Sequence, residues 1–147
     1  GYDNTIDSIS SYQIAKEKSD AEEKEIKNFI STSFDRISSQ FHIKYKVKGE
    51  REKLCKMDLI ASDDKDVFLI EIKRNTMNVD DEQLSLYNDI IKCVMNTTGD
   101  TRELTPLFII SNLDGYDDPN EYFFFENFDD ITDKSELKRI MKMFKHN

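Results

Sequence analysis

The sequence has few of the residues that build cysteine or histidine sites. Its only cysteines, Cys55 and Cys93, have no CxxC spacing, so neither a disulfide framework nor a cysteine metal cage is expected. This cysteine usage fits a reducing, cytoplasmic compartment. The only histidines, His42 and His146, are too few and too far apart in the sequence for the histidine-rich centres of HNH, HD or zinc hydrolases.

Long apolar stretches are also absent. No run approaches the roughly 18 to 20 apolar residues that span a bilayer, and the N-terminus lacks the basic-then-apolar layout of a signal peptide. We therefore expect no membrane partner. The chain opens with Gly1 and Tyr2 instead of Met, which is compatible with a piece of a larger protein whose further domains or subunits act with it.

Positive charge is scarce over the chain as a whole. The formal net charge of −9 argues against a nonspecific nucleic-acid coat, because attraction to phosphates needs positive charge. This objection weakens if basic residues gather on one surface, or if a separate domain supplies most of the affinity. The distribution of Lys and Arg therefore matters more than their total.

The length of 147 residues suits one compact core. We expect residues 1–18 to form a helical or flexible extension and residues 19–147 to form the domain. Ser19 or Asp20 can cap a first helix. Its apolar stripe, at a period of about 3.6 residues, consists of Ile26, Phe29, Ile30, Ser33 and Ile37.

Three strands are expected next. Strict alternation in HIKYKVK predicts a half-buried strand that places Ile43, Tyr45 and Val47 on one face and lysines on the other. Residues 57–61 and 67–73 predict two more strands, and the polar turn SDDKD between them predicts a hairpin.

A second helix is expected from Asp80 or Asp81 through Met95. Its predicted inward residues are Leu84, Tyr87, Ile91 and Val94. Strands at 107–111 and 122–125 follow, separated by turn signals at Asp114-Gly115 and Pro119. Asp133 can cap a terminal amphipathic helix, so the predicted element order is αβββαββα.

The hairpin brings three charged residues to one face. A turn centred between Asp64 and Lys65 pairs Ile60 with Leu69 and Asp58 with Glu71. Directly opposed residues of an antiparallel ladder point to the same face, with Cβ atoms about 4.5–5.5 Å apart. Lys73 lies two residues beyond Glu71 and projects from that face too.

Charges inside an apolar strand such as VFLIEIK are costly unless they are paired, metal-bound or functional. Two neighbouring carboxylates offer hard oxygen ligands of the kind that Mg²⁺ prefers. A lysine beside them can act on a water or stabilise charge on a phosphate. The alternative is an exposed strand face with an ordinary cross-strand ion pair.

Asp58, followed by a short hairpin and then by Glu71-Ile72-Lys73, resembles the signature of the PD-(D/E)xK, or restriction-endonuclease-like, nuclease superfamily. The resemblance implies an α/β fold with an αβββαβ core and a mixed central sheet flanked by helices, here followed by a C-terminal strand and helix. It also implies Mg²⁺-dependent hydrolysis of phosphodiesters, with Mn²⁺ as a substitute and DNA favoured over RNA. Met57 stands where the family often has proline.

Two further motifs extend the resemblance. Glu23-Lys24-Glu25-Ile26 is similar to the E-R-E-L segment of archaeal Holliday-junction resolvases, which implies Glu23 as a further metal ligand. Residues 83–87 are similar to the Q-x-x-x-Y motif of helicase-associated exonucleases, which implies a catalytic role for Gln83 and substrate contact by Tyr87. The alternatives are an acidic residue favoured by the helix dipole, a surface amide and a core aromatic.

One basic stretch precedes Asp58. We assign nucleic-acid contact to Lys44, Lys46, Lys48, Arg51 and Lys56, together with Arg74 and Tyr87. The same lysines could instead protect a strand edge from pairing. The leading hypothesis is a metal-dependent nuclease. A non-catalytic domain of the same fold that binds nucleic acid or protein, and a structural module with an accidental D…ExK match, remain open.

Overall fold

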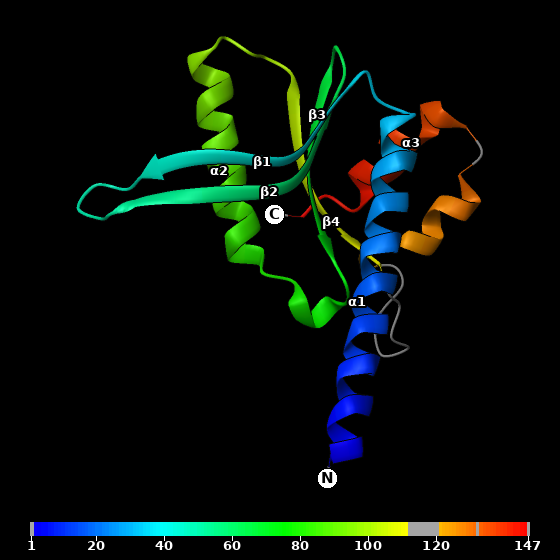
Figure 1. The fold of residues 1–147 in the computed structure, drawn as a ribbon. Helices are drawn as coiled ribbons and strands as arrows, with labels where there is room; N and C mark the ends of the chain where they lie inside the picture. The colour runs from blue at the N-terminus through cyan, green and yellow to red at the C-terminus, as the bar shows by residue number, and fades with distance from the viewer. Residues whose placement is uncertain (1, 112–120, 132, 147) are drawn as a thin grey trace.

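The computed structural model describes residues 2–111, 121–131 and 133–146 (Figure 1). The helices are α1 (Tyr2–Ser31), α2 (Asp81–Thr97) and α3 (Lys134–Met143), and the strands are β1 (Arg36–Lys46), β2 (Glu52–Ser62), β3 (Asp66–Lys73), β4 (Glu103–Ile110) and β5 (Phe123–Phe124). Short 3₁₀ helices, η1 (Thr76–Asn78) and η2 (Phe125–Asp130), follow β3 and β5. The predicted element order is confirmed. The turn signals at Asp114-Gly115 and Pro119 lie outside the described residues.

The strands form one mixed sheet in the order β1-β2-β3-β4-β5. The first three strands are antiparallel neighbours, whereas β4 runs parallel to both β3 and β5. Helix α2 connects the parallel strands β3 and β4, as such a crossover requires. The α/β fold with a mixed sheet is therefore confirmed. No helix within the described ranges is long and apolar enough to cross a membrane.

Helices cover both faces of the sheet (Figure 1). On one face, α1, η2 and α3 bury a cluster that includes Ile26, Leu59, Ile70, Leu107 and Leu137. On the other face, α2 packs its own residues against Met57, Leu69, Phe108 and neighbouring side chains. The two clusters are the hydrophobic cores that hold the sheet between the helices.

Helix α1 is longer than expected. It begins at Tyr2 instead of after Ser19 or Asp20, because residues 2–18 contain neither proline nor glycine to interrupt it. It ends at Ser31, so Ile37, expected on its apolar stripe, lies in β1. In Figure 1 the N-terminal part of α1 extends beyond the sheet.

The other helix starts agree with the sequence. The Asp80 side chain caps α2 by accepting a hydrogen bond from Gln83 N at 3.0 Å, and Asp133 caps α3 by accepting one from Ser135 N at 2.9 Å. One predicted inward residue of α2 is wrong. Val94 is 43% exposed and Met95 is buried in its place, because the inward face continues four residues beyond Ile91.

The β1–β2 hairpin bends at Gln40 and Asp58. Leu59 belongs to the cluster under α1, whereas Met57, which strict alternation would place on the same face, belongs to the cluster under α2. The strand register passes over Gln40 and Asp58, and Gln40 has a φ of 52°. Residues 41–57 consequently form an arm that crosses α2 (Figure 1). Val47, predicted to be buried, lies in the turn of this arm and is 45% exposed.

We expect Gln40→Gly to raise the free energy of unfolding by about 0.5–1 kcal/mol, since a side chain is strained at positive φ and glycine is not. Gln40→Val should lower it, because a β-branched residue tolerates this conformation least. Ser39→Gly, one residue away in ordinary strand geometry, is the control and should be destabilising. Urea denaturation measures all four proteins. Equal stability of the glycine and valine variants would contradict the assigned bend.

Candidate metal and nuclease site

Asp58 and Glu71 meet across the β2–β3 hairpin. The register pairs Ile60 with Leu69, as expected, and ends at Leu59 and Ile70. Beyond Leu59 and Ile70, hydrogen bonds between backbone N–H groups and side chains take the place of the backbone–backbone bonds of the ladder. The Asp58 N–H donates to Glu71 Oε1 at 3.2 Å, and the Ile72 N–H donates to Asp58 Oδ2 at 2.9 Å. These reciprocal bonds hold the two carboxyl groups together, as the hairpin arithmetic predicts.

Glu71 has an unusual electrostatic position. It is 4% exposed and lies on the central strand β3, between apolar neighbours. Burial raises the pKa of Glu71 to about 8, and the negative charge of Asp58 and its hydrogen bond add to the shift. The positive charge of Lys73 opposes it but contributes less. The positive charge of Lys73 therefore does not balance the two carboxyl groups of Asp58 and Glu71.

Lys73 shares the face of Glu71. Phe68 and Ile70 lie in the cluster under α1, while Val67 and Leu69 lie in the cluster under α2, so alternation places Glu71 and Lys73 on the α2 side. Lys73 is partly exposed at the carboxyl end of β3. Arg74 follows in an exposed position.

Tyr87 and Cys55 lie near the pair. Tyr87 is 8% exposed and belongs to the cluster between α2 and the arm, together with Cys55 and Met57. Burial raises the pKa of Tyr87, and the neighbouring Cys55 and Glu71 add to the shift. Burial also raises the pKa of the Cys55 thiol to about 11. This geometry favours the core-aromatic reading of Tyr87, which ties α2 to the arm. Gln83 lies partly buried in the first turn of α2.

Glu23 does not join the carboxylate pair. It lies on α1, which packs against the sheet face opposite to Glu71, and it forms an ion pair with Lys27 at 3.0 Å. Among the residues that the structure describes, no three His, Cys, Asp or Glu side chains are grouped closely enough to hold a metal ion. Glu23 is therefore not placed to act as the expected third ligand, because α1 covers the sheet face opposite to the carboxylate pair.

Five of the seven predicted nucleic-acid contacts lie on the arm, residues 41–57. This segment carries six Lys or Arg and two Glu, a net charge of +4 that leaves −13 for the rest of the chain. Phe41, Ile43 and Tyr45 pack toward α2, so alternation turns the intervening lysines away from it. Lys44, Lys46, Lys48, Arg51 and Lys56 are all exposed. Lys53, in contrast, pairs with Glu50 at 3.0 Å.

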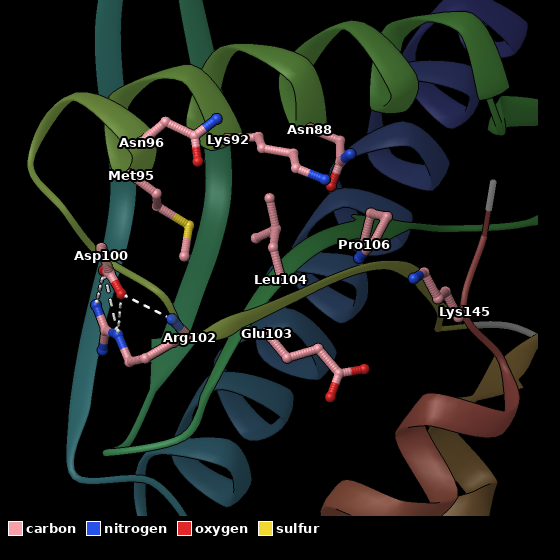
Figure 2. Close-up of a pocket in the computed structure, with 10 residues that line it drawn as sticks. All are labelled: Asn88, Lys92, Met95, Asn96, Asp100, Arg102, Glu103, Leu104, Pro106 and Lys145. Carbon is pink, nitrogen blue, oxygen red and sulfur yellow. Dashed lines mark hydrogen bonds and ion pairs between the residues drawn. The ribbon is translucent and has the colours of Figure 1, made fainter.

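A separate hollow lies between α2 and the start of β4 (Figure 2). It has a volume of about 410 Å³ and contains none of the predicted catalytic residues. Sequence patterns gave no signal for it, since its lining combines two distant parts of the chain. They also missed Cys55, because the adjacent apolar residues Leu54 and Cys55 leave the inward face ambiguous.

The predicted site residues divide between the two faces of the sheet. The structure brings Asp58, Glu71 and Lys73 together, places Tyr87 behind them and leaves Glu23 on the other side of the sheet. No family model matches the chain, and comparisons with curated proteins and with solved structures also found no match.

Proposed function

We propose that this protein is a divalent-metal-dependent nuclease that hydrolyses phosphodiester bonds, with DNA as its substrate. The observation that carries the proposal is the carboxylate pair of Asp58 and Glu71, held together inside the sheet by reciprocal hydrogen bonds. Two like charges in this position oppose folding unless a proton or a cation compensates them. The αβββαβ element order of residues 2–110 and the placement of Lys73 support the resemblance to PD-(D/E)xK nucleases.

The donor set fits Mg²⁺. Asp58 and Glu71 supply hard oxygens, and Mg²⁺ commonly binds through one or two carboxylates while its other positions hold water or phosphate. The raised pKa of Glu71 identifies the competitor, a proton that a bound cation would displace. When bound, Mg²⁺ or Mn²⁺ would lower the pKa of water and neutralise charge on the scissile phosphate.

The other residues have supporting roles in this proposal. Lys73 binds a non-bridging oxygen of the phosphate and stabilises the negative charge that develops there. The Ile72 N–H of β3 orients the Asp58 carboxyl group, and the Asp58 N–H of β2 orients that of Glu71, so each group is positioned by the backbone of the opposite strand. Gln83 lies in the first turn of α2, on the helix face that also carries Tyr87, and is proposed to contact the attacking water or the substrate.

Incubation with supercoiled plasmid and with single-stranded DNA, in Mg²⁺, Mn²⁺ or EDTA, tests the proposal. Cleavage that requires the cation and disappears in Lys73→Ala is the expected result. Failure to cut DNA or RNA with either cation, despite a cation-dependent rise in Tm, would favour a non-catalytic binding domain. The set of only two carboxylates and the charge of −13 outside the arm are the observations behind that alternative.

The arm provides a separate prediction on substrate binding. Lys44→Ala with Lys46→Ala should reduce the slope of log affinity against log salt by about 1–2, since each phosphate contact contributes about 0.9 for duplex DNA. Fluorescence anisotropy in EDTA measures this without cleavage. Lys16→Ala with Lys24→Ala removes the same charge from exposed positions of α1 and is the control. An equal reduction of this slope in both double variants would show that binding depends on net charge and not on the arm.

A further inference from the structure

The hollow in Figure 2 lies at an open edge of the sheet. Strand β5 pairs with Ile109 and Ile110, so the first part of β4 has no strand neighbour on that side among the residues that the structure describes. The C-terminal tail approaches this edge, where the His146 N–H donates to the Pro106 carbonyl at 2.9 Å. Helix α2 forms the opposite wall. The hollow is consequently formed by secondary structure and by an anchored tail.

Basic residues outnumber acidic residues in the lining of the hollow. The Asp100 carboxylate is held by the Arg102 guanidinium, at 2.6 Å for the closest pair of atoms, which lowers the pKa of Asp100 to about 2. The Glu103 carboxylate pairs with Lys142 of α3 at 3.1 Å. That ammonium also pairs with Asp66 at 2.7 Å, so Asp100 is neutralised and Glu103 only in part. The three basic and two acidic residues that line the hollow carry a net charge of +1. Lys92 and Lys145, which also line it, form no ion pair with any described residue.

Several polar groups gather at the end of the hollow away from Asp100 and Arg102. In Figure 2 the ammonium ends of Lys92 and Lys145 point toward the end next to Asn88 and Pro106, while the Glu103 carboxylate points away toward α3. The Asn88 Oδ1 atom is buried and has no hydrogen-bond partner. An unpartnered acceptor of this kind is costly, and a ligand hydroxyl would satisfy it.

We propose that this hollow binds a nucleoside phosphate monoester. The phosphate contacts Lys92 and Lys145, because its oxygens can accept hydrogen bonds from both ammonium groups. A sugar hydroxyl donates to Asn88 Oδ1, and the base packs on Met95 and Leu104 in the middle of the hollow. A volume of about 410 Å³ lies within the range of small-molecule sites. The same chemistry is offered by a free mononucleotide and by the terminal phosphate of a nucleic-acid strand.

Calorimetric titration of the whole chain in EDTA tests this site separately from the nuclease proposal. Adenosine 5′-monophosphate is compared with adenosine, and a 5′-phosphorylated oligonucleotide with the same oligonucleotide bearing a 5′-hydroxyl. We expect the phosphorylated member of at least one pair to bind more tightly. Lys92→Ala and Lys145→Ala should each weaken that binding about tenfold, or ~1.4 kcal/mol. Lys24→Ala on α1 is the control and should leave it unchanged.

The two ligand pairs distinguish the sources. A preference confined to the monophosphate supports a free nucleotide, and one confined to the oligonucleotide supports a strand end. The two members of each pair differ only in the 5′-phosphate. Binding by the basic arm to the rest of the ligand is therefore the same for both members and does not affect the comparison. Equal affinity within both pairs would overturn the proposal. So would a phosphate preference that survives the Lys92→Ala/Lys145→Ala double variant, provided that circular dichroism shows it to be folded.

Discussion

Replacing Lys73 by alanine is expected to slow cation-dependent cleavage by about 10²–10³-fold, the usual effect of removing one group that stabilises transition-state charge. Its affinity for Mn²⁺ should stay the same or rise slightly, because a lysine cannot ligate the cation and its positive charge competes with it. Asp58→Asn should lose cleavage and also bind Mn²⁺ at least about tenfold more weakly. Calorimetry and a plasmid assay measure the two properties independently.

The same hairpin offers a matched control. Lys65 is an exposed lysine in the β2–β3 turn, so Lys65→Ala changes the charge equally without touching the carboxylate pair. It should retain both cleavage and cation binding. If Lys73→Ala lost Mn²⁺ binding as sharply as Asp58→Asn does, the division between ligand and charge-stabilising residue would be wrong.

Glu71→Gln is expected to stabilise the cation-free protein at alkaline pH. The folded state raises the pKa of Glu71 from 4.5 to about 8, so between these values it binds a proton that the unfolded state does not. The stabilising contribution of this group is complete below pH 4.5 and is lost as pH rises through about 8. Glutamine stays neutral throughout. At pH 8.5 the free energy of unfolding of Glu71→Gln should exceed that of the wild type by on the order of a few kcal/mol, which raises Tm by roughly 5–10 °C.

The pH dependence of the difference is the decisive measurement. At pH 5, just above the unfolded pKa of 4.5, only a small part of this contribution is lost, so the wild type and Glu71→Gln should differ little in Tm. Glu52→Gln, at an exposed position of β2, should show no such divergence. Mg²⁺ should raise the Tm of the wild type more at pH 8.5 than at pH 6, because protons compete with the cation. A difference that does not vary with pH would contradict the burial of this carboxyl group.

Local patterns determined much of this molecule. The SDDKD turn determined the hairpin register. Side chains alternate between the two faces of a strand, so once the centre of the turn is known, each residue has only one possible partner. Asp80 and Asp133 fixed two helix starts, since each accepts a hydrogen bond from an orphan N–H of the first turn. From these signals alone the sequence determined the element order, the opposition of Asp58 and Glu71, and the common face of Glu71 and Lys73.

Tertiary packing decided what local patterns could not contain. Gln40 at positive φ bends the arm over α2, so the strand alternation that holds on either side of Asp58 fails across it. Helix α1 packs on the sheet face opposite to the carboxylate pair, so Glu23 pairs with Lys27 instead of approaching it. Lys145 lines the hollow beside Lys92 because the C-terminal tail binds Pro106, about forty residues away along the chain. Sequence periodicity records which residues share a face of one element, whereas these three features depend on which elements meet, and that is set by burial over the whole fold.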